Sequence, residues 1–465
     1  MPRHIVRIAL ALTASLSSTT AAQNLDRGRV TALVDSIVRE MQTRRHVPGV
    51  SVLLAHGGQP FFAKGYGFAD LDDDAPASPQ SVYAIASITK QFTAAAILLL
   101  AQEHKLQLDD DVSKYVSDLP MVRGPVTLRQ LLHHTTGIPP TGPLGDRYWN
   151  RRDYTREEWL NALAAAYKTR AQEFAPGTAW SYSDINYVLL SMVIEKVAAR
   201  TLWDVFRDRF FVPLGMTSTA QCNPGVVMKK RARGYLADST APLGVVPAPY
   251  VTPTVSLGNS GLCSNVLDLL KWQRGLVEGR VLDPASYAMM TTPGSLSDGT
   301  PTDYAMGVVK WPLGNETFTF HTGGAVGFTS FLGYLPGNDA TVIVVANGNA
   351  DPLRIGTELV RVARGWPLVK PIALSRQETE RYVGTYEGSG VTAIVQEANG
   401  ELEADVSGTP SVRFLFPVRL LKRGENDFVV GWEPESHVRF HLSRDRADSA
   451  AWSYGGRTVQ LSRTQ

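Results

Sequence analysis

The sequence predicts an α/β protein of the α+β kind: an antiparallel sheet flanked by helices, with an inserted mainly helical lobe, and then a C-terminal all-β barrel or sandwich domain. Three observations predict this fold. Apolar strand patterns lie near both ends of the first 365 residues, helical periodicity dominates between them, and short strands follow residue 382. With 465 residues, 44% of them hydrophobic, the chain is long enough for two or three domains.

The first domain is predicted over residues 23–367. Apolar residues at helical spacing predict a helix at 30–41, and Pro48 and Gly49 end it before two strands that a glycine pair separates. The elements expected in this domain are strands at 50–55, 61–66, 317–321, 328–335 and 341–346, and helices at 156–167, 187–200, 266–277 and 353–363. Because strands lie at both ends and helices between them, we expect one sheet assembled from both ends of the domain.

The second domain is predicted over residues 375–465. Short strands with intervening turn residues are expected at 393–396, 403–406, 412–417, 428–432, 438–442 and 458–461. This part of the sequence contains no evident catalytic cluster. We therefore expect it to pack against the first domain or to restrict substrate access.

The first 22 residues are typical of a secretory signal peptide. Arg3 and Arg7 precede an apolar stretch at 8–16, which is about half as long as a membrane helix needs, and small residues follow up to Ala22. We expect cleavage near Ala22, a periplasmic or secreted protein, and no stable membrane anchor. In an oxidising compartment the only two cysteines, Cys222 and Cys263, could form a disulfide; two buried thiols are the alternative.

The charge balance argues against a nucleic-acid partner. The formal charge is +2, and without Arg3 and Arg7 it is zero, which leaves no basic excess to bind phosphates. The adjacent His133 and His134 lack the spacing of a helical zinc motif, so we expect a structural role for them and neither a metal nor a cofactor. A small molecule or a peptide remains as the expected partner, and the oligomeric state is left open.

A serine and a lysine three positions apart begin a strongly apolar helical stretch. Residues with this spacing share one face of a helix, so the Lys90 amine can approach the Ser87 hydroxyl. The apolar run at 94–101 predicts that the helix is buried, with the positive end of its dipole near Ser87. The pair therefore predicts an activated nucleophile.

Two later motifs supply partners for such a nucleophile. Tyr182 precedes a predicted helix 95 positions after Ser87, and His321-Thr322-Gly323-Gly324 ends a predicted strand 139 positions after that tyrosine. A tyrosine can carry a proton, and glycines allow a substrate to approach the strand edge closely. Together, the three motifs predict a site for acyl transfer.

In these motifs the chain resembles the serine β-lactamase and penicillin-binding protein family, in particular the branch that holds class C β-lactamases, D-alanyl-D-alanine carboxypeptidases, D-aminopeptidases and related esterases. The resemblance extends over about residues 25–365 and implies a β-lactamase/transpeptidase-like fold. It implies these site residues: catalytic Ser87, Lys90 and Tyr182; substrate-binding Asp184, His321, Thr322 and Gly323; and an oxyanion hole made by the backbone N–H groups of Ser87 and Gly324.

Two positions depart from the family pattern. His321 stands where class C β-lactamases usually have lysine, and histidine carries only a partial positive charge near neutral pH. Asp184 stands where asparagine is common, and its carboxylate should pair with Lys90 and favour the charged amine. On this interpretation Lys90 lowers the pKa of Tyr182, and Tyr182 is the base.

These observations predict an exported serine hydrolase that cleaves amide or ester bonds through a Ser87 acyl-enzyme. We expect a D-amino-acid peptidase, a carboxypeptidase or an esterase, with weak β-lactamase activity. The alternative is a non-catalytic sensor that binds penicillins or peptidoglycan fragments. Selectivity among these substrates depends on loops such as residues 139–148 and on the second domain, which sequence patterns do not resolve.

Overall fold

The computed structural model describes residues 26–464 apart from 118–121, 123, 141–154, 169, 171, 255, 314–315, 364–371, 399, 408–417, 431–432 and 455–456. The predicted signal peptide, most of the loop at 139–148 and the predicted strand at 412–417 lie outside the described residues. Within the described ranges, no helix has the length and apolar character that a membrane span requires.

Seven strands form the central sheet in the order β3-β2-β1-β12-β11-β10-β9. Their bounds are β1 Gly49–His56, β2 Gln59–Asp70, β3 Ala75–Pro76, β9 Val309–Leu313, β10 Glu316–Ala325, β11 Phe328–Leu335 and β12 Ala340–Ala346. In the middle of the sheet, β1 pairs antiparallel with β12, so that Val52 lies opposite Val344. The prediction of one antiparallel sheet assembled from both ends of the domain is confirmed.

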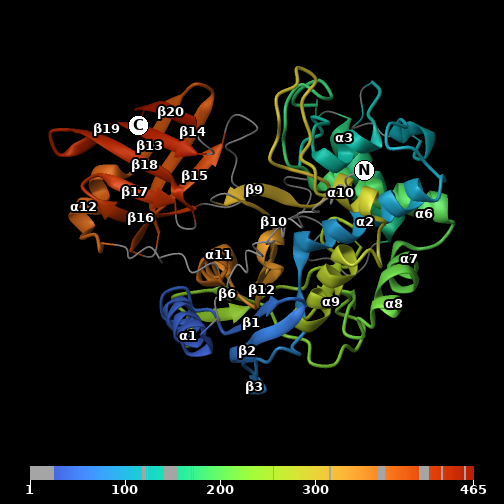
Figure 1. The fold of residues 1–465 in the computed structure, drawn as a ribbon, viewed down its shortest axis with the longest axis horizontal. Helices are drawn as coiled ribbons and strands as arrows, with labels where there is room; N and C mark the ends of the chain where they lie inside the picture. Colours follow the sequence, from blue (N-terminus) through green and yellow to red (C-terminus); the bar gives the residue numbers. More distant parts are fainter. Residues whose placement is uncertain are drawn as a thin grey trace, which may run out of the picture.

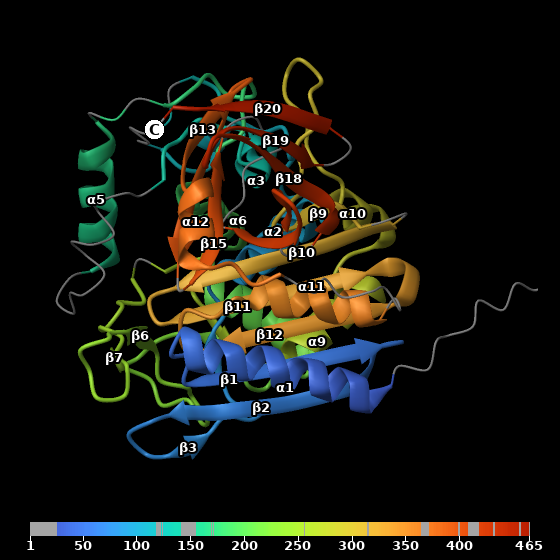
Figure 2. The same ribbon diagram turned by 90° about the vertical axis from the view of Figure 1, so that its left-hand side faces the viewer.

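Helices cover both faces of this sheet. Figure 2 shows α1 (Arg27–Arg44) and α11 (Pro352–Ala363) across one face, and α9 (Val266–Val277) contacts β1 and β12. Side chains alternate between two cores along β1: Val52 enters the core under α1 and α11, whereas Leu53 enters the core shared with α9. This alternation follows from the two-residue period of a strand.

The mainly helical lobe surrounds α2 (Thr89–Gln102), most of whose side chains are buried. Its other helices are α3 (Leu128–His133), α5 (Arg156–Tyr167), α6 (Asp184–Ala198), α7 (Leu202–Phe206), a π-helical turn (Arg207–Phe211), α8 (Val212–Leu214) and α10 (Pro284–Met290). Phe92 of α2 stacks on Trp272 of α9, with ring centres 3.8 Å apart. The lobe and the sheet are therefore joined through α2, the helix that follows Ser87.

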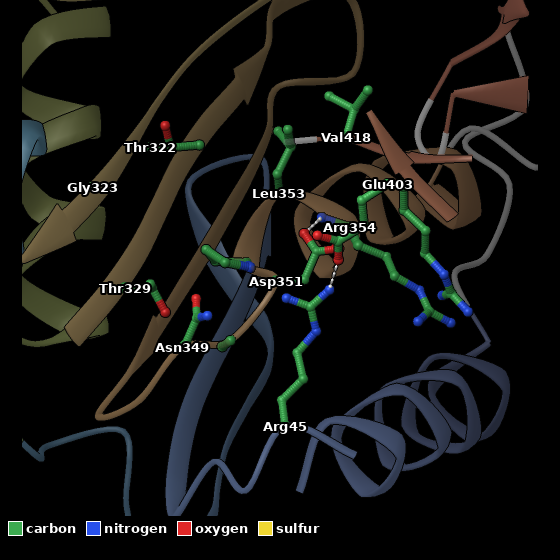
Figure 3. A pocket seen from close by; sticks show the side chains of 13 residues that line it. Arg45, Thr322, Gly323, Thr329, Asn349, Asp351, Leu353, Arg354, Glu403 and Val418 are labelled. Carbon is green, nitrogen blue, oxygen red and sulfur yellow. Dashed lines mark hydrogen bonds and ion pairs between the residues drawn. The ribbon is translucent and has the colours of Figure 1, made fainter. Parts of the chain in front are cut away.

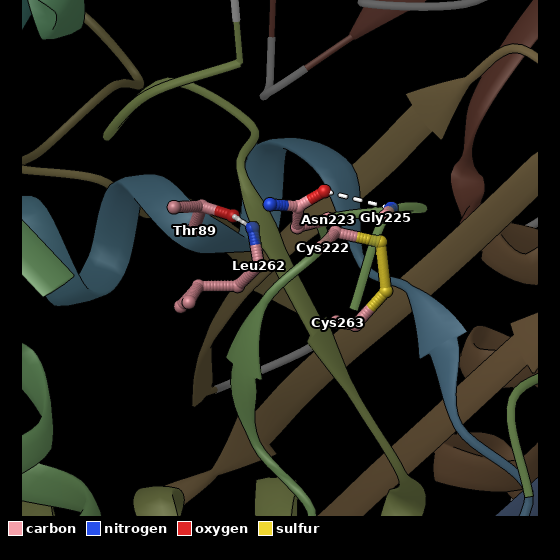
Figure 4. The surroundings of a disulfide bond; sticks show 6 residues. All are labelled: Thr89, Cys222, Asn223, Gly225, Leu262 and Cys263. Atoms are coloured by element: carbon pink, nitrogen blue, oxygen red, sulfur yellow. Dashed lines mark hydrogen bonds between the residues drawn. A yellow bond between two sulfur atoms is a disulfide. The ribbon is translucent and has the colours of Figure 1, made fainter. Parts of the chain in front are cut away.

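A three-stranded sheet in the order β4-β8-β5 holds the segment that leads to α2. Its strands are β4 (Tyr83–Ala84), β5 (Ala220–Gln221) and β8 (Leu262–Ser264), and a separate pair is formed by β6 (Tyr235–Ala237) and β7 (Val245–Pro247). Cys263 of β8 forms a disulfide with Cys222, which directly follows β5 (Figure 4). Of the two alternatives for the cysteines, the structure therefore has the disulfide.

The C-terminal strands close into an eight-stranded barrel (Figure 1). After α12 (Arg376–Tyr382), its strands are β13 Gly384–Gly388, β14 Val391–Ala398, β15 Glu401–Ser407, β16 Val418–Gly424, β17 Asp427–Val430, β18 Glu433–Ser443, β19 Arg446–Tyr454 and β20 Arg457–Arg463. Tyr386, Phe440 and Trp452 fill its interior. The sequence patterns missed α12, β13, β16 and β19, because polar, small or glycine residues interrupt their apolar periodicity.

Charged and apolar contacts join the barrel to the first domain. Arg45, which follows α1, forms an ion pair with Glu403 of β15, and Arg419 of β16 pairs with Glu40 of α1 at 3.2 Å. Arg419 also pairs with Glu401 of β15. Trp311 of β9 packs against the cores of both domains. The barrel is thus held beside the strand that borders β10.

Removing the Arg419 side chain should destabilise this junction. The side chain is only 8% exposed, so Arg419→Ala leaves Glu401 without this partner in a largely buried place. We expect a lower thermal unfolding midpoint, with a loss of about 1–3 kcal/mol in the free energy of unfolding. Arg376→Ala, which removes a 93% exposed side chain, is the control and should leave the midpoint unchanged. Equal midpoints for both variants would show that the Arg419 contacts do not stabilise the protein.

Candidate active site

Ser87 lies in a short 3-10 turn, Ala86–Ile88, immediately before α2. The backbone of Ala86 has a φ of 47°, in the left-handed region that residues with a Cβ rarely adopt. Hydrogen bonds on both sides hold this turn: Ser330 Oγ donates to the Ile85 carbonyl at 2.8 Å, and the Ile85 N–H donates to the Leu262 carbonyl at 3.0 Å. The turn that carries Ser87 is therefore held between β11 and β8.

The strand β10 passes directly beside this turn. A methyl group at Gly323 would lie 2.3 Å from the Ile85 carbonyl oxygen, so only glycine permits this approach. β9 pairs with β10 only from Glu316 to Phe320. Within the described part of the chain, residues 321–325 therefore have β11 on one side and no strand on the other. An extended substrate can form backbone hydrogen bonds along such an edge.

The structure brings Lys90, Ser87 and Asp184 together as predicted. The Lys90 side chain is fully buried, and its Nζ lies 3.2 Å from Ser87 Oγ and 2.6 Å from Asp184 Oδ1. A third contact of 2.9 Å runs to the backbone carbonyl of Asn259. The carboxylate and the carbonyl can only accept hydrogen bonds, so they occupy two amine hydrogens, and the remaining direction on Nζ faces the serine hydroxyl.

Burial is the largest influence on the charge of Lys90. It lowers the pKa of the Lys90 amine below the ordinary lysine value, and the nearby Asp184 carboxylate opposes this shift without cancelling it. A neutral amine donates to Asp184 and Asn259 and accepts from the Ser87 hydroxyl. Lys90 can thus act as the base for Ser87.

The predicted lowering of the Tyr182 pKa is wrong. Burial and the negative charge of Asp184 raise the pKa of Tyr182 well above its usual value. The Lys90 Nζ lies over the face of the Tyr182 ring, 4.7 Å from its centre, and does not pair with the hydroxyl. That hydroxyl is buried near the Ser87 side chain, whose influence lowers the pKa of Tyr182 without cancelling the rise. Tyr182 therefore remains a phenol, which can donate a proton.

The expected partial positive charge on His321 is also wrong. The ring is fully buried, and burial lowers its pKa to about 3. Its Nδ1 lies 2.5 Å from the Thr322 carbonyl, to which it donates, and its Nε2 lies 3.0 Å from the Tyr304 hydroxyl, from which it accepts. His321 is thus a neutral residue behind the strand and provides no cation for a substrate carboxylate.

The remaining predicted residues lie along β10. Gly324 is exposed, so its backbone can face a substrate, whereas Thr322 is buried and its Oγ1 has no partner in the described structure. Thr322 and Gly323 line a pocket that extends to the start of α11 and to the barrel (Figure 3). The ion pair between Arg45 and Glu403 lies at its far side. The barrel thereby reaches the surroundings of the active-site strand.

Sequence reasoning missed the aromatic support of Tyr182. The ring of His134 lies 4.4 Å from that of Tyr182 and 4.7 Å from that of Tyr304. Its Nδ1 accepts from the Ser183 N–H at 3.2 Å and from Asn186 Nδ2 at 3.0 Å. The adjacent histidines in the sequence did not indicate that His134 packs against Tyr182. No pattern near Tyr304 in the sequence indicates that its ring packs against His134. In the described ranges, no three potential metal ligands come together.

The chain is similar to proteins of one known family. The family model described as Beta-lactamase matches residues 34–364. The protein flp of Staphylococcus aureus (strain N315) is 30% identical over 326 residues, which make up 68% of this chain. The match spans 63% of the length of that relative.

Two solved structures extend the comparison. The octameric penicillin-binding protein homologue from Pyrococcus abyssi superimposes with a TM-score of 0.67 at 25% identity, covering 94% of this chain and all of that one. The D-stereospecific amidohydrolase from Streptomyces sp. has a TM-score of 0.59 at 25% identity, covering 71% of this chain and 97% of that one. With the matched family model and the serine, lysine and tyrosine assembled around one turn, the chain belongs to the beta-lactamase family.

Proposed function

We propose that this protein is an exported serine hydrolase that cleaves amide or ester bonds through an acyl-enzyme on Ser87. The observation that carries the proposal is the Lys90 amine, whose two acceptor contacts leave it directed at the Ser87 hydroxyl. The family and the similar D-stereospecific amidohydrolase support D-configured amides or peptides as substrates.

Acylation begins with transfer of the Ser87 hydroxyl proton to the neutral Lys90 amine. The serine oxygen forms a bond to the substrate carbonyl carbon, and the electron pair of the C=O bond moves to the carbonyl oxygen. The backbone N–H groups of Ser87 and Gly324 would stabilise this oxyanion. The glycine-dependent contact between β10 and the turn at Ile85 keeps the two groups near each other.

Breakdown of the tetrahedral intermediate requires a proton for the leaving group. The Lys90 ammonium, which received the Ser87 proton, passes a proton to the leaving atom and becomes neutral again. Tyr182, which stays protonated because its pKa is raised, donates a hydrogen bond to that atom. The bond from the carbonyl carbon to the leaving nitrogen or oxygen then breaks, which leaves the acyl group on Ser87. Water, activated by the same base, hydrolyses the ester and regenerates the serine.

Export is part of the same proposal. The basic and apolar pattern before Ala22 supports cleavage there. The disulfide between Cys222 and Cys263 supports an oxidising location such as the periplasm or the outside of the cell.

The acyl-enzyme can be detected by intact-mass spectrometry. On incubation with a chromogenic cephalosporin, the wild type should gain the mass of the acyl group and lose it again within the assay, whereas Ser87→Ala should gain none. Ser113→Ala, which alters an exposed serine, should behave as the wild type. Equal labelling of Ser87→Ala would refute the assigned nucleophile. An adduct that never decays, on this compound or on D-amino-acid amides and esters, would favour the sensor alternative.

The charge of Lys90 should appear in the pH dependence of acylation. The Asp184 carboxylate raises the pKa of Lys90, whereas burial lowers it, so Asp184→Asn lowers that pKa further. Neutral Lys90 is then available at lower pH. The acid limb of the plot of acylation rate against pH should therefore shift to lower pH by about 1–3 units, and the variant should still be acylated. Stopped-flow acylation rates across pH test this. A limb that stays in place or moves up would show that Lys90 is not the base.

A further inference from the structure

We propose that Asp184 binds an ammonium group on the carbon next to the scissile carbonyl, so that the protein prefers amides or esters of amino acids whose amino group is free. The inference rests on the proposed function, and it assigns Asp184 a second role besides its ion pair with Lys90. On this proposal, the aspartate that replaces the usual asparagine at position 184 determines which substrates the protein prefers.

The Asp184 carboxylate is placed to contact a substrate. It begins α6, its side chain is 37% exposed, and in the described part of the chain only Lys90 donates to it, through Oδ1. Oδ2 is therefore left for a donor that comes from outside. Asparagine at this position would offer a neutral amide, whereas aspartate offers acceptor oxygens with a full negative charge.

The distances allow contact with the α position of an acyl group. The two contacts of Lys90 Nζ, 3.2 Å to Ser87 Oγ and 2.6 Å to Asp184 Oδ1, place those oxygens at most 5.8 Å apart. A carbonyl carbon poised for attack lies about 3 Å from the serine oxygen. The nitrogen of an α-ammonium group is two bonds from that carbonyl carbon. When the group points toward α6, the nitrogen is within hydrogen-bond reach of the Asp184 carboxylate.

The charge balance of the site favours a cation. When Lys90 is neutral, as acylation requires, Asp184 leaves one uncompensated negative charge beside Ser87. His321, the histidine of the third motif, does not balance it, because its ring is neutral and fully buried, with both nitrogens hydrogen-bonded inside the protein. A substrate ammonium would compensate that charge, whereas a substrate carboxylate would be repelled by it.

Three p-nitroanilides isolate this charge: phenylalanine p-nitroanilide, its N-acetyl derivative, and the analogue in which hydrogen replaces the amino group. The chiral compounds are assayed as both enantiomers at pH 7, where an α-amino group is mainly charged. For the preferred enantiomer, we expect kcat/KM of the wild type to be at least roughly tenfold higher with the free amine than with either neutral compound. A difference of this size is what one charge-assisted hydrogen bond contributes. In Asp184→Asn the ratio should fall to within about threefold.

Asp73→Asn is the matched control, because Asp73 is an exposed aspartate in the turn between β2 and β3 and its substitution removes the same charge elsewhere. It should keep the wild-type ratio. Equal rates for the three compounds in the wild type, or a preference that survives in Asp184→Asn, would overturn the proposal. If the Asp184→Asn variant misfolds, the rates of the wild type on the three compounds still test whether the protein prefers a free amine. If no compound is hydrolysed and no probe acylates Ser87, the proposed function itself fails and the inference fails with it.

Discussion

Removal of the Lys90 amine from water is the constraint on which the rest of the site depends. A buried charged amine is costly, and a buried neutral amine still needs hydrogen-bond partners. The protein supplies these from three separate segments: Ser87 before α2, Asp184 at the start of α6, and the Asn259 carbonyl. Because the three segments must meet at one nitrogen, the positions of two helices and a loop are set by the needs of a single side chain.

The surrounding packing holds these segments in register. Gly258, next to the Asn259 carbonyl, accepts a hydrogen bond from Thr93 of α2 and donates one to Ser191 of α6. The loop is therefore tied to the same two helices that carry Lys90 and Asp184. Such a site is built by long-range contacts, and a small displacement of either helix would alter the direction of the amine.

Much of the fold, and the placement of Ser87, Lys90 and Tyr182 close together, could be predicted from the sequence. The apolar runs of β1 and β12 were clear because both strands lie in the middle of the sheet and are buried on both faces, and the Ser87–Lys90 contact follows from helical spacing. The charge state of Tyr182 could not be predicted, because it depends on burial that only the assembled structure provides. The contact between His134 and Tyr304 joins residues 170 positions apart, and no local pattern reports it.

The unpaired segment of β10 has a consequence beyond catalysis. A strand edge with free backbone groups can recruit another chain and start aggregation, and proteins keep such edges short or irregular. Here the neighbouring strand β9 covers β10 up to Phe320 and leaves only residues 321–325 open, two of which are glycine. The opening is long enough for a small ligand backbone and too short to template a stable intermolecular sheet. The same five residues thus give a substrate access to the strand edge while they keep that edge short.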